Sequence, residues 1–168
     1  MLSKIKHSKR TGQNYQFAIV ASKYNNVYVD AMLEAARRTL SDAKANAVEV
    51  VRVPGAFEIP VVAAKLAQSR SPRFSAIICL GVILRGATTH AQHIAEAVSQ
   101  SLAQIQVNWQ VPIIHEVLLL ENKEQAVERC LSQEHNRGAE AAYTALEMAG
   151  IMAELPNSRR SGKHPNTE

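Results

Sequence analysis

Short apolar runs of strand length alternate along the chain with longer segments in which apolar residues recur at a helical period. This alternation is typical of a parallel sheet whose faces are covered by helices. We therefore predict an α/β fold with a four-stranded parallel sheet. The expected strands are residues 15–21, 47–53, 76–83 and 112–119, and the last two are apolar on both faces, as buried parallel strands are.

The clearest helical pattern follows the first expected strand. Val29, Met32, Leu33, Ala36 and Leu40 recur at the spacing of one face of an amphipathic helix. Similar patterns predict further helices at residues 57–68, 90–107, 123–133 and 139–155. No internal repeat interrupts this order, so we expect a single domain over residues 15–155.

The charge distribution argues against nucleic acid as a partner. The net charge of +4 comes largely from the two ends of the chain, and the chain has one Trp and three Phe for stacking on bases. No apolar run reaches the length of a membrane span, and the start of the chain lacks the apolar stretch of a secretory signal. We expect a cytoplasmic protein that binds neither nucleic acid nor membrane.

The two ends differ from the middle in composition. Residues 1–14 are polar and basic but contain Ile5, so we expect a flexible segment that is a candidate to add to a neighbour's sheet. Residues 156–168 are polar and contain two prolines, which predicts a disordered tail. Cys79 and Cys130 lie in apolar and helical patterns without CxxC spacing, and both are expected to be reduced core residues.

Ligands of an open parallel sheet bind beyond the carboxyl ends of its strands, so the junctions from strand to helix are examined for chemistry. After the third strand, Gly86 suits a tight turn, and Thr89 with Gln92 fits a capping box that makes His90 the first helical residue. Free N–H groups and the positive end of the helix dipole then converge on residues 86–88. An anionic substrate such as a phosphate is indicated.

The same dipole disfavours an imidazolium, so His90 is expected to favour the neutral form that accepts a proton. His90 is therefore a candidate general acid and base. The pattern fits a surface histidine at a helix start equally well. A metal site with His93, three residues later, is a weaker alternative because no third ligand is evident.

Two further junctions carry candidate binding residues. Pro54 and Gly55 end the second strand, and Glu58 then lies at the mouth of a helix, either as a partner for the hydroxyls of a polyol or as a simple complement to the dipole. Tyr24 and Asn25 follow the first strand, where an aromatic face is able to stack on a heterocycle. Arg129 is a candidate phosphate ligand, although most arginines of this kind are simply exposed.

Four sequence blocks together resemble the lumazine synthases over roughly residues 15–152. They are VPGAFEIP at 53–60, GVILRGATTH at 81–90, ENKEQAVER at 121–129 and NRGAEAA at 136–142, in the right order and spacing. The resemblance implies a flavodoxin-like three-layer sandwich that assembles into pentamers or into assemblies of pentamers. It also implies an enzyme that uses no metal and no organic cofactor.

The resemblance further implies a reaction and a role for each matching residue. The reaction condenses 5-amino-6-(D-ribitylamino)uracil with 3,4-dihydroxy-2-butanone 4-phosphate, through an imine, loss of phosphate and ring closure. His90 would transfer protons. The implied binding residues are Tyr24 and Asn25 at the pyrimidine, Ala56, Phe57 and Glu58 along the ribityl chain, Val82, Ile83 and Leu84 through their backbone at the uracil ring, and Ala87, Thr88 and Arg129 at the phosphate.

The chain departs from the family pattern in two places. His115 and Glu116 stand where relatives commonly have an aromatic residue and a glycine, and we expect His115 to approach the pyrimidine bound by a neighbouring subunit. Gln133 stands at the place of a lysine, while Arg137 retains a charge. Two rival functions use the same fold, a flavin or nucleotide carrier and a noncatalytic shell protein. The absence of GxGxxG and the presence of both His90 and Arg129 argue against them.

Overall fold

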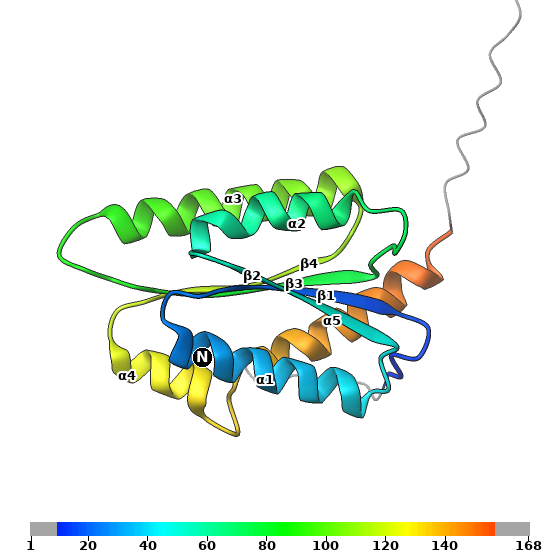
Figure 1. Ribbon diagram of the computed structural model, residues 1–168, viewed down its shortest axis with the longest axis horizontal. Helices are drawn as coiled ribbons and strands as arrows, with labels where there is room; N and C mark the ends of the chain where they lie inside the picture. The colour runs from blue at the N-terminus through cyan, green and yellow to red at the C-terminus, as the bar shows by residue number, and fades with distance from the viewer. Residues whose placement is uncertain (1–9, 157–168) are drawn as a thin grey trace, which may run out of the picture.

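The computed structural model describes residues 10–156 and contains one parallel sheet of four strands (Figure 1). Its order is β2-β1-β3-β4. The strands are β1 (Gln16–Ser22), β2 (Ala47–Val53), β3 (Ala76–Leu84) and β4 (Ile113–Leu120). The predicted α/β class, the number of strands and their parallel direction are confirmed, and each strand lies within one residue of its predicted bounds.

Helices cover both faces of the sheet and complete three layers (Figure 1). One face carries α2 (Ile59–Ala67) and α3 (His90–Trp109), and the other carries α1 (Asn26–Asp42), α4 (Lys123–Ala126) and α5 (Arg137–Glu154). Because each connection between parallel strands passes through a helix, the strands all run in one direction and share one carboxyl edge.

Two apolar cores lie on either side of the sheet. Along β3 the side chains alternate between them, so that Ile78 and Leu80 pack with α1 and α5 while Ile77 and Cys79 pack with α2 and α3. This explains why β3 is apolar on both faces in the sequence. Cys79 and Cys130 are both buried and unpaired, as predicted.

Two predicted helices differ in detail from the observed ones. The segment expected at 57–68 begins as a 3-10 turn, η1 (Ala56–Glu58), before α2. The segment expected at 123–133 is four residues of α4 followed by a π-helical turn, η2 (Val127–Leu131). Periodicity of apolar residues does not separate these tighter and wider turns from an α-helix.

Residues 10–14 are joined to the domain. The Gly12 N–H donates to the Ala43 carbonyl at 2.6 Å, and Arg10 pairs with Glu154 at 2.8 Å. The predicted flexible and tail segments fall mostly on residues 1–9 and 157–168, which lie outside the described residues. Within residues 10–156, no helix has the length and apolar character needed to cross a bilayer.

The start of α5 packs against α1 with no space for a side chain at Gly138. A Cβ built on Gly138 would lie 1.9 Å from the Met32 carbonyl oxygen and 2.6 Å from the Met32 Cα. Both are backbone atoms, so neither is able to rotate away. Gly138 therefore sets the distance between the two helices.

We expect Gly138→Ala to lower the free energy of unfolding by about 3 kcal/mol or more, because the added methyl group forces the backbones apart. Gly86→Ala is the control, since nothing lies within 4 Å of a Cβ at Gly86 and its φ is not positive. Urea denaturation followed by circular dichroism measures both. Equal stability of the two variants would contradict the tight packing.

Candidate active site

An open cleft of about 810 Å³ lies at the carboxyl edge of the sheet, between the loops that follow β1, β2 and β3. Most of the candidate residues named from the sequence line it. They are Tyr24, Asn25, Ala56, Phe57, Glu58, Val82, Ile83, Leu84, Thr88 and His90. Ala87, His115 and Arg129 do not line it. The cleft therefore gathers the three predicted junctions into one site.

The loop after β1 is held in a specific backbone conformation. Asn25 has a left-handed backbone with φ 56°, and its Nδ2 donates to the Val82 carbonyl oxygen at 2.8 Å. The Tyr24 N–H donates to the Pro54 carbonyl at 3.1 Å, and the Tyr24 side chain is 71% exposed. Left-handed backbone in a residue other than glycine costs free energy and is often found at functional sites. Asn25 thus fixes the loop while Tyr24 leaves its ring open to the cleft.

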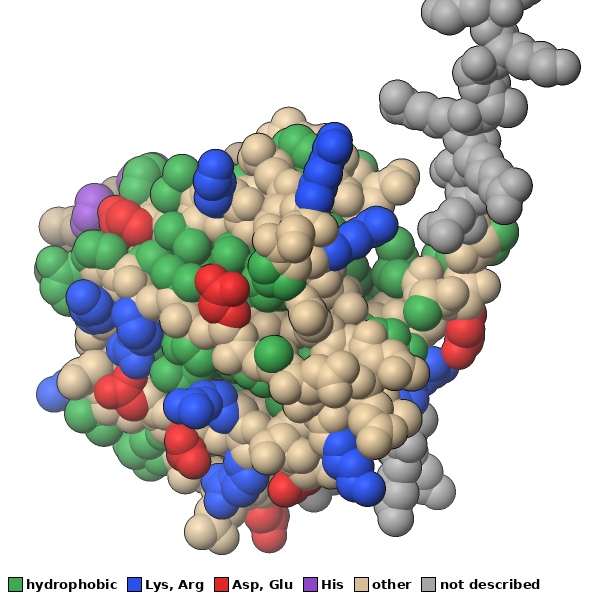
Figure 2. All heavy atoms as spheres, turned by 45° about the vertical axis from the view of Figure 1, so that its right-hand side comes forward, with side chains coloured by type: hydrophobic (Ala, Val, Ile, Leu, Met, Phe, Trp, Pro, Cys, Tyr) green, Lys and Arg blue, Asp and Glu red, His purple; other side chains and the backbone are tan. Residues whose placement is uncertain are grey.

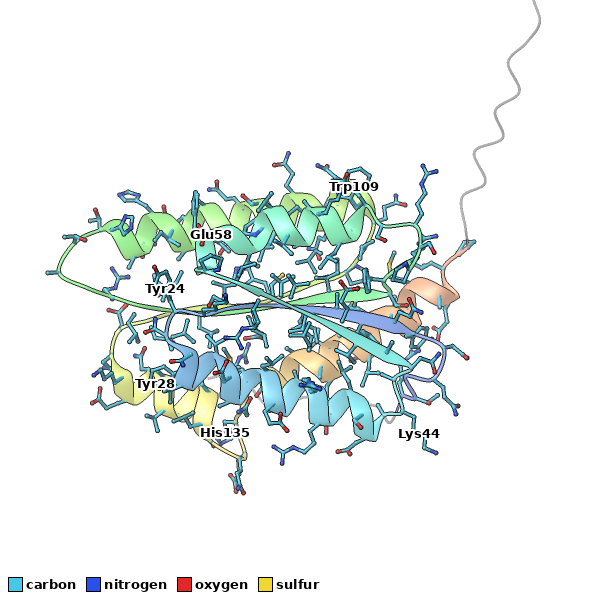
Figure 3. The ribbon with its side chains drawn as sticks, viewed as in Figure 1. Tyr24, Tyr28, Lys44, Glu58, Trp109 and His135 are labelled. Carbon is cyan, nitrogen blue, oxygen red and sulfur yellow. The ribbon has the colours of Figure 1, made fainter. Side chains whose placement is uncertain are left out.

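Glu58 lies where the sequence placed it, at the mouth of α2. Its Oε2 accepts from the Gly55 N–H at 2.8 Å, so the carboxylate is held at the edge of the cleft. Figure 3 shows Tyr24 and Glu58 at the same end of the sheet, opposite to Trp109. A Cβ at Gly55 would lie 2.9 Å from Glu58 Oε2 and 3.1 Å from the Tyr24 ring, so glycine permits their close approach.

The predicted capping box at the start of α3 is wrong. Thr89 is the N-cap residue and His90 the first helical residue, as expected, but the Thr89 side chain makes no capping bond. Gln92 instead accepts from Arg85 Nη2 at 2.9 Å and donates to Glu96 at 2.6 Å. Because the N–H groups of a first helical turn have no partner within the helix, those of α3 are left for a ligand.

The glycine at position 86 is not required by a tight turn. Its φ is not positive, and a Cβ there would meet nothing within 4 Å. The loop is instead fixed by Arg85, whose side chain pairs with Glu121 at 2.9 Å and with Gln92. The sequence did not indicate this role for Arg85, because Glu121 is 36 residues away in the chain and Gln92 is 7 residues away.

Two histidines of α3 line the cleft. His90 is joined there by His93, which the sequence raised only as a metal ligand, and by Ile94 and Ala97. Residues three and four apart lie on one face of a helix, so the sequence spacing from His90 could have predicted that these residues share the cleft. Among residues 10–156, no group of three His, Cys, Asp or Glu side chains is arranged to hold a metal ion. On the face drawn in Figure 2, histidine side chains lie at one end of the molecule beside exposed hydrophobic ones.

Arg129 lies on the other face of the sheet, in η2, which packs against α1. Its side chain is exposed. The neighbouring Cys130 is anchored in the core, and its carbonyl accepts from Asn136 Nδ2 at 2.5 Å. The π-helical turn thus presents Arg129 to solvent from a fixed base, outside the cleft of its own chain.

His115 is separated from the cleft of its own chain by α3. Its Nε2 lies 2.8 Å from the hydroxyl of Ser99. At 3.6 residues per turn, Ser99 lies about 180° around the helix from His90. His115 therefore meets the side of α3 that faces away from the cleft.

Glu116, which departs from the family pattern, forms an ion pair with Arg137 and is itself buried. Glu116 is 6% exposed and accepts from Arg137 Nε at 3.0 Å and Nη2 at 2.8 Å, while Arg137 also pairs with Glu140. Burial raises the pKa of Glu116, and the Arg137 guanidinium opposes this shift. The pair fastens β4 to the start of α5, on the face away from the cleft.

The cleft combines an open aromatic ring, a fixed carboxylate, exposed amides at a helix start and an imidazole. This set suits a heterocycle that carries hydroxyl groups, an anion and proton transfer between them. The comparison with known families agrees with it. The family model for 6,7-dimethyl-8-ribityllumazine synthase matches residues 14–153, which include the whole sheet and its helices except the last residue of α5. The chain therefore belongs to the 6,7-dimethyl-8-ribityllumazine synthase family.

Proposed function

We propose that the cleft condenses 5-amino-6-(D-ribitylamino)uracil with 3,4-dihydroxy-2-butanone 4-phosphate to give 6,7-dimethyl-8-ribityllumazine. The chain is a member of this transferase family of riboflavin biosynthesis. The observation that carries the assignment of the cleft is the convergence of Tyr24, Glu58 and His90 from three separate junctions.

The uracil substrate takes the inner part of the cleft in this proposal. Tyr24 stacks on the pyrimidine, with Asn25 beside it, and the backbone groups of residues 82–84 bind the ring edge. The Val82 carbonyl already accepts from Asn25, which leaves the neighbouring groups for the uracil. Glu58 accepts from hydroxyls of the ribityl chain, which runs past Ala56 and Phe57.

The butanone phosphate takes the start of α3. Its dianion accepts from the amides around Ala87 and Thr88 and from those of the first turn of α3, which the Thr89 side chain leaves uncapped. Arg129 neutralises the phosphate. Because Arg129 lies outside the cleft of its own chain, we propose that it comes from a neighbouring subunit.

His90 moves protons between the bound reactants. The 5-amino group attacks the ketone and water is lost to give an imine; loss of inorganic phosphate then gives an enol, and ring closure releases a second water. His90 at the mouth of the cleft accepts and returns the protons of these steps. Holding both reactants together supplies the rest of the acceleration.

The direct test is to incubate the purified protein with both substrates and follow the absorbance and fluorescence of the lumazine. Product above the slow spontaneous reaction is expected. Folded protein without such product would contradict the assignment and favour a noncatalytic shell protein, whereas tight flavin binding without turnover would favour a carrier.

We further propose a cytoplasmic homopentamer, or an assembly of pentamers, in which adjacent subunits share each site. Tyr24 and Phe57 are 71% and 60% exposed at the cleft, which supports cover by a neighbour. His115 and Arg129 lie where their own cleft does not reach them. Both observations are explained if each subunit completes the site of the next.

Replacing His90 tests the proton transfer. We expect His90→Ala to lower kcat by about ten- to ten-thousand-fold with KM values nearly unchanged. His135→Ala is the control, since His135 lies on the loop between η2 and α5 and does not line the cleft. Steady-state kinetics with chemistry shown to be rate-limiting decides the matter, and unchanged turnover would remove His90 from the mechanism.

Replacing Arg129 tests the phosphate site. Arg129→Ala is expected to raise KM for the butanone phosphate far more than KM for the uracil, because only the former carries the dianion. Lys123→Ala removes an exposed cation from the adjacent α4 and serves as the control. Equal weakening of both substrates would indicate a general structural role for Arg129.

Mixed assembly tests the shared site. Inactive His90→Ala subunits and impaired His115→Ala subunits, refolded together, are expected to regain activity, since about a quarter of interfaces in a random mixture pair intact His90 with intact His115. His90→Ala mixed with Glu58→Ala is the control. Both of those residues line one cleft, so every cleft keeps a defect.

Light scattering at assay concentration completes this test. A fully active monomer would contradict the shared site altogether. Oligomers that show no complementation would contradict only the role given to His115.

A further inference from the structure

The hydrogen bonds of His115 define where its proton lies. The Ser99 hydroxyl is 2.8 Å from the Ala95 carbonyl oxygen and 2.8 Å from His115 Nε2. A hydroxyl has one proton to donate, and the carbonyl oxygen is able only to accept. Ser99 therefore donates to Ala95, and His115 donates its Nε2–H to Ser99.

The other ring nitrogen has the opposite role. The Val117 N–H points at His115 Nδ1 at 3.3 Å, so that Nδ1 is an acceptor and carries no proton. A proton on Nδ1 would point at the hydrogen of the Val117 N–H and repel it, so this hydrogen bond requires a bare Nδ1. The two contacts thus agree on one neutral tautomer, protonated at Nε2 alone.

The surroundings of the ring favour the same state. Burial, the largest influence, lowers the pKa of His115 and so favours the neutral ring. On β3, its register partner is Cys79, whose own pKa is raised by burial. On α3, Glu96 follows Ala95 in the chain, and its carboxylate accepts a hydrogen bond from Gln92.

With both nitrogens occupied, the ring has only its faces and carbon edges to offer. Yet His115 remains exposed, on the side of α3 opposite to the cleft of its own chain. Because the ring faces away from the cleft of its own chain, any cleft that it completes belongs to a second copy. An uncharged aromatic face is what a flat heterocycle stacks on.

We propose that Ser99 is a positioning residue, which holds His115 as a neutral Nε2–H imidazole, so that the ring meets a neighbour's substrate as an aromatic face and transfers no proton. The proposal rests on the shared site described under the proposed function. In this proposal Ser99 contributes to substrate binding through His115, although Ser99 does not line the cleft of its own chain.

The state of the ring is read directly by solid-state NMR of the assembled protein, labelled with ¹⁵N-histidine. His115→Phe identifies the signals that belong to His115. A protonated Nε2 and a bare Nδ1 at neutral pH are expected. A charged ring, or a proton on Nδ1 alone, would overturn the proposal.

Kinetics test the function of the face. His115→Phe keeps a flat ring and is expected to restore most of the uracil binding that His115→Ala loses, as fits a role that needs no nitrogen. Ser99→Ala is expected to raise that KM by about two- to tenfold, the effect of one lost hydrogen bond, with kcat changed less. Adding Ser99→Ala to His115→Phe should then change nothing further.

Two kinetic results would overturn the proposal. One is a loss of kcat greater than tenfold in His115→Phe, which would show that a ring nitrogen takes part in the chemistry. The other is an equal effect of Ser99→Ala with and without His115, which would show that Ser99 acts elsewhere. Failure of the unaltered protein to form lumazine would contradict the proposed function instead, and the NMR spectrum would still decide the state of His115.

Discussion

The order of the strands determines where this protein places its chemistry. β1 and β3 are neighbours at the centre, and the chain leaves β1 toward β2 on one side and β3 toward β4 on the other. The loops that follow β1 and β3 therefore diverge and leave a crevice at their carboxyl ends. Tyr24 enters this crevice from one loop and His90 from the other, while Glu58 approaches along the edge from β2.

The parts of the fold that local sequence predicts are those with a strong local cause. β2 ends at Val53 because Pro54 and Gly55 favour a turn over a further residue of strand, and His90 begins α3 because the helical period of apolar residues starts there. Glu58 could be placed for the same reason, since a proline two residues later belongs to a first helical turn.

Contacts between distant segments were beyond such reasoning. Thr89 and Gln92 have the spacing of a capping box, but in the folded chain the Gln92 side chain accepts a hydrogen bond from Arg85 and donates one to Glu96 instead. The hydrogen bond between Ser99 and His115 joins α3 to β4, and no local sequence pattern predicts that these two residues meet. The family resemblance supplied roles for His115 and Arg129 that a single chain's cleft does not display.

The ion pair of Glu116 with Arg137 has a consequence for substitution at either position. Because Glu116 is buried, removal of Arg137 alone would leave an unpaired carboxylate in the core, which costs about 3–5 kcal/mol. Replacement of both residues together leaves no unpaired charge and costs far less. The two positions are therefore coupled, and Arg137 is free to change only when Glu116 changes with it.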